Sequence, residues 1–172
     1  MAWFLRPAAP NDAEQVVTVL VEGFEGYRPI APPGWEPPDA NAELERLRTF
    51  LGNDEVWCLI AEEDGAPAGH VAIMPGRLHP RRSDDGGVAH FWQLFVRPRW
   101  WGTGLATELH AEAVREASAR GFTSMRLFTP AAQARARRFY EREGWTATGE
   151  PTEDPDIGMP IVEYRRAISS SV

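Results

Sequence analysis

The residues best suited to chemistry lie in one stretch, where an apolar segment runs into a glycine-containing turn. The segment 94–96 is followed by Pro98, and the turn 101–106 (Trp-Gly-Thr-Gly-Leu-Ala) opens a helical pattern. Glycines let the backbone approach an anion closely, and a helix N-terminus directs free N–H groups toward it. The stretch therefore predicts a phosphate-binding turn. The alternative is a tight strand-to-helix turn that binds no ligand.

The basic residues restrict how such an anion can be held. All 18 basic residues are arginines, and the chain contains no lysine. This excludes a Schiff-base or pyridoxal phosphate lysine, and it argues against the P-loop and kinase designs that depend on a lysine. The turn also lacks the three-glycine spacing of dinucleotide-binding folds. A bound phosphate must therefore be held by backbone N–H groups, by arginine or by a metal.

Composition excludes further classes of protein. The net charge of −7 and the pI near 5.1 argue against a nucleic-acid partner. One cysteine and four scattered histidines provide neither a disulfide framework nor metal-ligand spacing, so we expect no metal. The sequence shows no apolar run of membrane-spanning length and no signal-peptide pattern, which predicts no membrane partner and a cytoplasmic location. The length of 172 residues predicts one domain, residues 1–172.

The elements before the turn indicate antiparallel pairing. Segment 23–39 is interrupted by several prolines and carries three aromatic residues, so we expect an irregular loop there. Segment 75–87 has the composition of an exposed loop. Hydrophobic periodicity predicts the remaining elements: a strand at 3–6, a helix starting near residue 12, a helix at 41–51, a hairpin of strands 56–61 and 69–74, and a strand at 90–96.

The elements after the turn alternate between helix and strand. We expect a helix at 103–120, a strand at 125–129, a helix at 131–142 opened by Pro130, and closing strands at 145–148 and 161–168. Strand, helix, strand in this order implies a parallel pair with a crossover. Both halves together predict an α+β fold, an α/β/α sandwich with a mixed central sheet.

The glycine turn resembles the coenzyme A motif of the GNAT superfamily of acetyl-CoA-dependent N-acetyltransferases. That family shows an apolar strand, a Val-x-Pro stop and then Gln/Arg-x-x-Gly-x-Gly/Ala. In the frame 101–106, Gly104 and Ala106 match, while Trp101 replaces the usual Gln or Arg. The alternative alignment, residues 99–104, matches the residue types of the motif directly, but it lies closer to Pro98 than the motif usually does in this family. The substitution leaves backbone contacts possible and puts a side-chain contact at residue 101 in doubt.

A second motif lies downstream and is similar to the last helix of the same family. Residues 133–145 resemble its Asn-x-x-Ala followed by Phe-Tyr-x-x-x-Gly-Phe, with Gln133 in place of Asn and Trp145 in place of the final Phe. With the order of elements, the resemblance covers nearly the whole chain. It implies the GNAT acyl-CoA N-acyltransferase fold, in which a parallel strand pair, here 90–96 and 125–129, splays apart.

The resemblance implies a cosubstrate, acetyl-CoA, bound in the gap between these strands. The acetyl group would pass directly to a primary amine in a ternary complex. The alternative is a non-catalytic acyl-CoA-binding or sensing module. The residues implied to hold coenzyme A are Leu94, Phe95 and Val96 for the pantetheine arm, the amides of Trp101, Gly102, Thr103, Gly104, Leu105 and Ala106 for the pyrophosphate, and Gln133.

The resemblance also implies a general acid, Tyr140, which would protonate the leaving thiolate. His90 is the candidate general base, because an imidazole with a pKa near 6.5 suits proton removal at neutral pH. Strand alternation predicts that its side chain shares one face with Trp92, Leu94 and Val96. Glu22 and Glu25 are rival bases. The alternative for Tyr140 is packing alone, and for His90 a histidine without chemistry.

The acceptor is expected to be a small-molecule amine or a peptide N-terminus. In this family it binds between the first two helices and the loop that here spans 75–87. Phe24, Tyr27 and Trp35 would form an aromatic wall, and Glu22 or Glu25 would attract an ammonium. The alternatives are a carboxylate bound by Arg77, Arg81 and Arg82, and loops that are merely solvated. The oligomeric state stays open, with a homodimer among the options.

Overall fold

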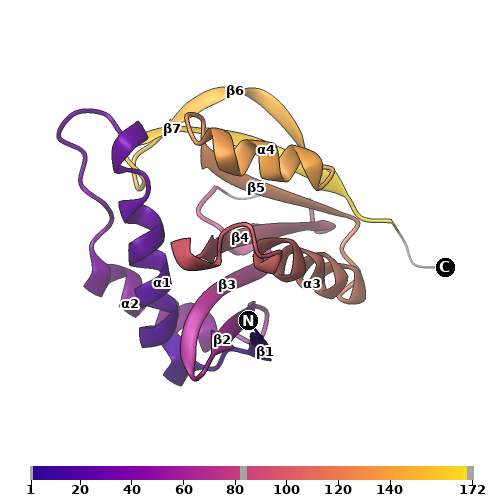
Figure 1. The fold of residues 1–172 in the computed structure, drawn as a ribbon. Coiled ribbons are helices and arrows are strands. Elements are labelled where there is room, and N and C mark those ends of the chain that lie inside the picture. The colour runs from indigo at the N-terminus through magenta and orange to yellow at the C-terminus, as the bar shows by residue number, and fades with distance from the viewer. Residues whose placement is uncertain (1, 82–84, 170–172) are drawn as a thin grey trace.

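A computed structural model describes residues 2–81 and 85–169 and confirms the predicted α+β fold. Seven strands of the described chain form one sheet in the order β1-β2-β3-β4-β5-β7-β6 (Figure 1). The β4–β5 pair is parallel, and the other neighbours are antiparallel. The elements are β1 (Phe4–Pro7), α1 (Ala13–Glu25), α2 (Ala40–Leu51), β2 (Trp57–Glu63), β3 (Ala66–Pro75), β4 (Val88–Val96), α3 (Leu105–Ala119), β5 (Ser124–Pro130), α4 (Ala134–Arg142), β6 (Thr146–Asp154) and β7 (Met159–Ala167).

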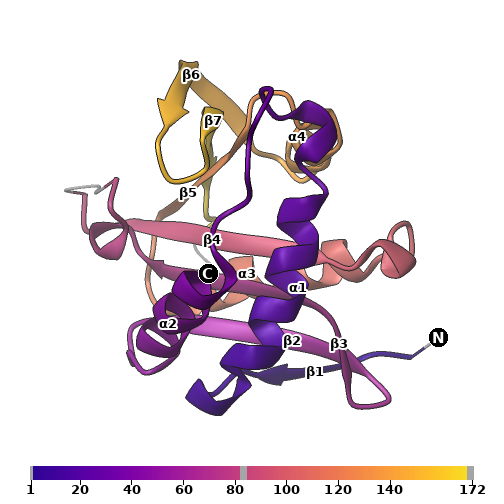
Figure 2. The ribbon, with the colours of Figure 1, turned by 90° about the vertical axis from the view of Figure 1, so that its left-hand side faces the viewer.

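Helices cover both faces of the sheet, as the sandwich prediction requires (Figure 2). On one face α1 and α2 pack over an α1-side cluster, which includes Val16, Leu20, Phe24, Leu47, Met74 and Trp92. On the other face α3 and α4 pack over an α3-side cluster, which includes Val71, Phe91, Leu105, Leu109, Tyr140 and Trp145. The sheet is therefore buried on both sides, which explains why its central strands are apolar at nearly every position.

The parallel strands β4 and β5 pair only at their beginnings. Residues 88–90 of β4 lie opposite residues 124–126 of β5. Beyond them β4 continues to Val96, while β5 continues in its ladder with β7 as far as Pro130. The two strands diverge, so the sheet opens a gap in its middle. This confirms the splayed parallel pair.

A β-bulge in β4 reverses the direction of the side chains that follow it. Between β3 and β4 the register passes from Ile73 opposite Phe91 to Val71 opposite Leu94, so β4 holds one extra residue. Gln93 has a left-handed φ of 79°, which is unusual for a residue other than glycine. Phe91 before the bulge and Leu94 after it both pack in the α3-side cluster.

The predicted common face of His90, Trp92, Leu94 and Val96 is therefore wrong. Trp92 packs in the α1-side cluster, whereas Leu94 and Val96 pack against the α3-side cluster. The physical reason is the extra residue, which changes the alternation by one position.

Several predicted boundaries also need correction, and the largest difference is in the first closing strand, because β6 runs to Asp154 and not only to residue 148. Helix α1 extends to Glu25, into the segment expected to be irregular, and a short 3-10 turn follows at Arg28–Ile30. Helix α4 begins at Ala134 and not at residue 131, because Pro130 ends β5. The Ala131 N–H donates to the Pro160 carbonyl oxygen at 2.9 Å, so the chain is still held by the sheet there.

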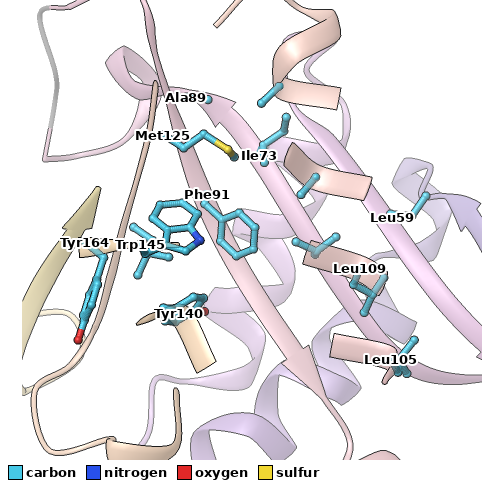
Figure 3. Close-up of a cluster of buried hydrophobic side chains, with 14 of the residues drawn as sticks. Leu59, Ile73, Ala89, Phe91, Leu105, Leu109, Met125, Tyr140, Trp145 and Tyr164 are labelled. Carbon is cyan, nitrogen blue, oxygen red and sulfur yellow. The ribbon is translucent and has the colours of Figure 1, made fainter. Parts of the chain in front are cut away.

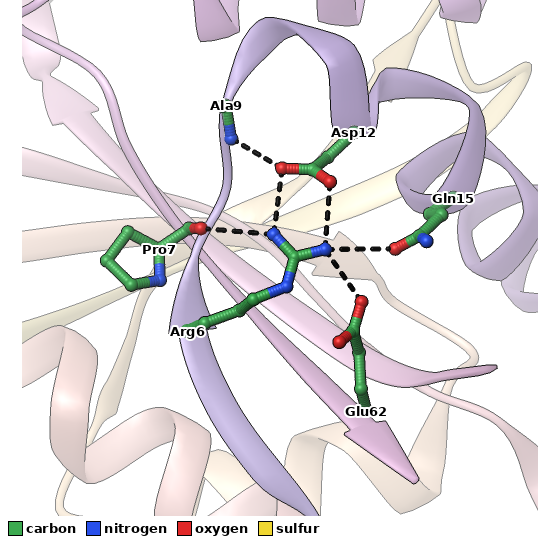
Figure 4. Close-up of polar contacts among 6 residues, drawn as sticks. All are labelled: Arg6, Pro7, Ala9, Asp12, Gln15 and Glu62. Carbon is green, nitrogen blue, oxygen red and sulfur yellow. Dashed lines mark hydrogen bonds and ion pairs between the residues drawn. The ribbon is translucent and has the colours of Figure 1, made fainter. Parts of the chain in front are cut away.

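An arginine fastens the N-terminal strand to its neighbours (Figure 4). The guanidinium of Arg6 donates to both carboxylate oxygens of Asp12 at 2.9 and 2.8 Å and to Glu62 at 2.7 Å. Asp12 also accepts from the Ala9 N–H at 2.7 Å. These bonds lower the pKa of Asp12 below its usual range. The network fixes β1, β2 and the start of α1 relative to one another.

Candidate functional site

A cavity of about 1630 Å³ passes through the gap between β4 and β5. This exceeds the roughly 300–1,000 Å³ of ordinary small-molecule pockets. Its wall on one side comes from α1, α2 and the segment after α1, and on the other side from the glycine turn and α4. The space is therefore lined from both faces of the sheet.

The backbone of β4 presents unpaired hydrogen-bonding groups to this cavity. The Arg97 N–H donates to the Ala68 carbonyl oxygen at 2.9 Å, and Phe95 lies opposite His70 in the same ladder. Because bonded and non-bonded pairs alternate along an antiparallel ladder, the backbone of Phe95 faces β3, whereas that of Leu94 and Val96 faces the gap. Phe95 lines the cavity as well, but its backbone groups belong to the ladder with β3, so its predicted backbone contact with coenzyme A stays a prediction that this register does not favour.

The indole of Trp101 forms a hydrogen bond with one of the backbone groups that face the gap. Its Nε1–H donates to the Val96 carbonyl oxygen at 2.8 Å, although the ring is 50% exposed. The N–H and C=O of Leu94 and the N–H of Val96 are left facing the gap. These three groups could pair with an extended, amide-containing chain in the manner of an added strand.

The bulge is held by a contact that the sequence analysis missed. His70 is fully buried on β3, and its Nε2 lies 3.0 Å from Oε1 of Gln93. The contact ties the side chain of the left-handed residue to the neighbouring strand. Gln93 directly precedes Leu94, so the contact also fixes where the free backbone groups point. Nothing in the sequence marks this glutamine, because left-handed backbone favours glycine, asparagine or aspartate.

Replacing Gln93 with alanine should destabilise the fold. The buried His70 would lose its partner, which costs about 1–3 kcal/mol in free energy of unfolding. Urea denaturation at pH 7.5 measures this. Gln133→Ala is the matched control, since the Gln133 side chain forms no hydrogen bond with another described residue, and its effect should stay below about 0.5 kcal/mol. Equal stability of the two variants would show that the His70 contact does not hold the bulge.

The glycine turn has the backbone conformation that an anion site needs. Gly102 and Gly104 have φ of 77° and 94°, and a Cβ at either position would meet no atom within 4 Å. Glycine is required there by the left-handed backbone and not by crowding. Helix α3 begins at Leu105, and Gly104 provides no side-chain cap. The first N–H groups of α3 therefore have no partner within the helix.

Two side chains of the turn stabilise its structure and do not line the cavity. Leu105 is fully buried in the α3-side cluster, and the Thr103 hydroxyl donates to the Trp100 carbonyl oxygen at 2.6 Å. Neither residue lines the cavity, whereas Gly102, Gly104 and Ala106 do. Gln133, at the start of α4, lies on the cavity wall as well.

Tyr140 lies on α4 with its ring in the α3-side cluster, next to Phe91 and Trp145 (Figure 3). Its side chain is 8% exposed, and it lines the cavity. The hydroxyl has no hydrogen bond to another described residue. Burial raises the pKa of Tyr140 above its usual range, and the neighbouring Tyr27 adds to this. The phenol therefore keeps its proton at neutral pH and has it available for donation.

His90 lies near the point where β4 and β5 separate. It is 3% exposed, lines the cavity and stacks on His79 with ring centroids 3.9 Å apart. Its Nδ1 has no partner among the described residues. Burial lowers the pKa of His90 well below 6.5, and His79 and Arg126 contribute to the shift. The imidazole is therefore neutral at pH 7 and is a weaker base than the sequence alone suggested.

Comparison with known proteins identifies the protein family to which the chain belongs. The sequence model of the acetyltransferase (GNAT) family matches residues 20–145. The chain belongs to this family. An uncharacterized N-acetyltransferase of Mycobacterium tuberculosis is 28% identical over 149 residues, covering 83% of this chain and 88% of that protein. An uncharacterized N-acetyltransferase of Archaeoglobus fulgidus is 27% identical over 137 residues, with 79% and 88% covered.

Solved GNAT structures share the whole fold. A putative GNAT acetyltransferase from Desulfovibrio desulfuricans superposes with a TM-score of 0.75 at 24% identity, covering 98% of this chain and all of that chain. The PaiA N-acetyltransferase of Thermoplasma acidophilum, solved with coenzyme A, gives a TM-score of 0.72 at 17% identity, with 95% and 98% covered. Both show that the arrangement of sheet and helices is that of the GNAT family.

The acceptor side of this GNAT cavity departs from the sequence prediction. Phe24 and Tyr27 line it as expected. Trp35 does not: its Nε1–H donates to the Ile157 carbonyl oxygen at 2.6 Å, which anchors the α1–α2 connection to the turn after β6. Glu22 lies on the wall, but Arg97 donates to both of its carboxylate oxygens at 2.8 Å. This pair lowers the pKa of Glu22, so the carboxylate stays ionised, but its negative charge is balanced by Arg97 and is not free to attract an ammonium.

The remaining rival groups are also engaged. Glu25 is exposed and pairs with Arg28. Arg77 pairs with Glu55, and Arg81 pairs with Asp154 at 3.2 Å. Arg82 lies outside the described residues. The described arginines of this loop are thus neutralised by carboxylates of the chain itself.

Two further findings concern the described part of the chain as a whole. Residues 2–81 and 85–169 contain no group of three or more His, Cys, Asp or Glu side chains arranged to hold a metal ion. Within the same ranges, every helix is too short or too polar to span a membrane.

Proposed function

We propose that this GNAT protein transfers the acetyl group of acetyl-CoA to a primary amine by direct transfer in a ternary complex. One observation carries the proposal: a single cavity is lined by Leu94 and Val96 of β4, by the glycine turn and by Tyr140. The strand could hold an amide-containing arm, the turn could bind a phosphate, and the phenol could donate a proton. The coenzyme A complex of PaiA supports this choice of donor.

The fit to acetyl-CoA rests on the chain's own groups. Leu94 and Val96 would bind the pantetheine arm through the backbone groups that face the gap, and the Leu94 N–H is positioned in this proposal to polarise the thioester carbonyl. The N–H groups of residues 104–106 would meet the pyrophosphate at the start of α3. No lysine is needed for either task.

The proposed reaction uses two side chains for proton transfer. The amine nitrogen attacks the thioester carbonyl carbon, the C–N bond forms and the C–S bond then breaks. Tyr140 gives its proton to the leaving thiolate, while His90 accepts the proton that the attacking nitrogen loses. The products are an amide and coenzyme A with a free thiol, and the two side chains return to their starting states by exchange with solvent.

Replacing His90 with asparagine tests its assignment as the base. Because general base catalysis contributes about 10²–10⁴-fold, kcat should fall by about 100-fold while the KM for acetyl-CoA changes little. His79→Asn is the matched control, since His79 stacks on His90 without being assigned a proton transfer. If H90N kept the kcat of H79N, His90 would not be the base.

The acceptor in this proposal is a small-molecule amine or a peptide N-terminus. The aromatic surface of Phe24 and Tyr27 supports an acceptor with an apolar part next to its amine.

The function is tested by incubating the protein with acetyl-CoA and a panel of primary amines and peptides while measuring thiol release. Turnover with at least one acceptor is the expected result, and calorimetry should show coenzyme A binding. Binding without turnover for every acceptor would support the non-catalytic acyl-CoA module instead. If coenzyme A did not bind, both functions would be wrong.

A further inference from the structure

One buried carboxylate on the cavity wall lacks the partners that buried charges normally have. Glu43 lies in the first turn of α2, its side chain is only 4% exposed, and it lines the cavity. Arg46 lies 3.4 Å away, but the carboxylate accepts no hydrogen bond from any described residue. The start of a helix favours a negative charge, yet it leaves these oxygens without a donor. Because buried charges are normally paired and hydrogen-bonded, the position points to a partner outside the chain.

A second carboxylate lies on the same wall, in the turn between β6 and β7. Asp156 lines the cavity, and its side chain forms neither an ion pair nor a hydrogen bond within the described part of the chain. Burial raises the pKa of Glu43, Arg46 lowers it and Asp156 raises it further, so Asp156 lies close enough to act on the same carboxylate. The two carboxylates therefore leave a negative charge that Arg46 alone does not balance.

The turn that carries Asp156 is held against the α1–α2 side of the molecule (Figure 2). Trp35, in the connection between α1 and α2, donates its Nε1–H to the Ile157 carbonyl oxygen at 2.6 Å. A Cβ added at Gly158 would lie only 3.2 Å from the same indole. Ile157 also packs against the α1-side cluster, to which Leu47 of α2 belongs. The position of Asp156 near α2 is thus fixed by the residue that follows it.

The other carboxylates of the cavity wall already have partners. Glu22 and Asp154 are each paired with an arginine of the chain. Asp39 caps the start of α2 by accepting a backbone N–H at 2.9 Å. The negative charge that is left for a ligand therefore belongs to Glu43 and Asp156.

We propose that Glu43 and Asp156 bind a second ammonium group of the acceptor, which is therefore a diamine with an apolar chain between its two nitrogens. The inference rests on the proposed function and names its acceptor class. An ammonium would donate charge-assisted hydrogen bonds to both carboxylates and balance their charge. Tyr27, Phe50 and Trp92 line the same cavity, and their rings suit the apolar chain.

Acceptors of equal length that differ only in their far end test the second charge. Cadaverine, pentylamine and δ-aminovalerate present a cationic, a neutral and an anionic end, and thiol release from acetyl-CoA gives kcat/KM for each. We expect kcat/KM for the diamine to exceed that for the monoamine by about tenfold, because a hydrogen-bonded charge pair contributes that much. The amino acid should be the poorest acceptor. Repeating the set with longer and shorter chains finds the length that suits the cavity.

Isosteric variants locate the charge. E43Q and D156N should each remove most of the advantage of the diamine, through a higher KM for it, while kcat/KM for pentylamine stays within about twofold. A merely structural role of either carboxylate would change both acceptors alike. E45Q is the matched control, because Glu45 is exposed on α2, pairs with Arg48 and lies away from the cavity.

Three results would overturn the inference and leave the proposed function standing. They are equal kcat/KM for diamine and monoamine at every chain length, a diamine advantage that the double variant E43Q/D156N keeps in full, and turnover of peptide N-termini alone. If neither an amine nor a peptide were acetylated, the proposed function would fail and the inference with it.

Discussion

A Tyr140→Phe variant should bind coenzyme A as tightly as the unmodified protein and lose about 100-fold or more in kcat. The phenol is the only assigned source of a proton for the leaving thiolate, and general acid catalysis contributes about 10²–10⁴-fold. The pKa of Tyr140 is raised by burial, so the hydroxyl is protonated across the neutral range. The loss should therefore appear in kcat at every pH near neutrality.

The variant keeps the packing of the ring, which separates catalysis from stability. Phe91 and Trp145 contact the ring edge-on, with centroids 6.2 and 6.0 Å away, and phenylalanine preserves both contacts. Steady-state kinetics with an acceptor identified in the amine panel measure kcat. Calorimetry measures the affinity for coenzyme A, and a thermal melt measures the stability. Tyr27→Phe is a comparison variant, because it removes a hydroxyl from a partly buried tyrosine of the same cavity that is assigned no proton transfer. A kcat of Y140F equal to that of the unmodified protein would remove the acid role of Tyr140.

Much of this site could be predicted because its chemistry demands particular residue types. The turn needs left-handed backbone at Gly102 and Gly104, which glycine supplies, so the sequence shows it directly. The splayed pair follows from the strand–helix–strand order together with the family resemblance. Tyr140 belongs to a short sequence motif on one helix, and the residues of this motif match the family pattern closely enough to be recognised. Each of these features is local in sequence.

Features that depend on distant residues or on register could not be predicted. The bulge at Gln93 is hidden because β4 is buried on both faces, so a slip of one residue leaves its apolar pattern unchanged. Trp35 meets the carbonyl of Ile157, 122 positions later, and Glu22 meets Arg97, 75 positions later. Nothing in either sequence neighbourhood marks its partner. The acceptor side therefore differs most from the prediction, since its side chains are fixed by such long-range contacts.

The protein should lose stability steeply as the pH falls from 7.5 to 5.5. Burial lowers the pKa of His70 and His110 to about 4 and that of His90 well below 6.5. In the unfolded chain these histidines regain a pKa near 6.5. Below that pH the unfolded state binds protons that the folded state does not, so the free energy of unfolding falls as the pH decreases. Each histidine contributes a loss of about 1.4 kcal/mol between pH 7.5 and 5.5.

Other groups modify this loss without reversing it. Burial also lowers the pKa of His79 to about 4, which acts in the same direction. Burial raises the pKa of Glu43, with a further rise from Asp156, so this carboxyl favours the folded state on acidification. The three fully buried histidines together remove about 4 kcal/mol, which is a large part of the roughly 5–15 kcal/mol that stabilises a typical domain. Urea denaturation at pH 7.5, 6.5 and 5.5 measures the trend.

His110→Gln separates one contribution from the rest. The Trp145 Nε1–H donates to His110 Nε2 at 2.9 Å, and a glutamine oxygen can accept the same bond without titrating. Arg166 and Glu143 are the charged groups beside the ring, at 3.5 and 3.8 Å. The variant should lose about 1.4 kcal/mol less than the unmodified protein between pH 7.5 and 5.5. In the double variant H79Q/H110Q, the loss of free energy of unfolding should be smaller by a similar further amount, because the two rings contact different residues and their effects should add. If H110Q kept the full pH dependence, His110 would be protonated in the folded state, and the bond from Trp145 could not form.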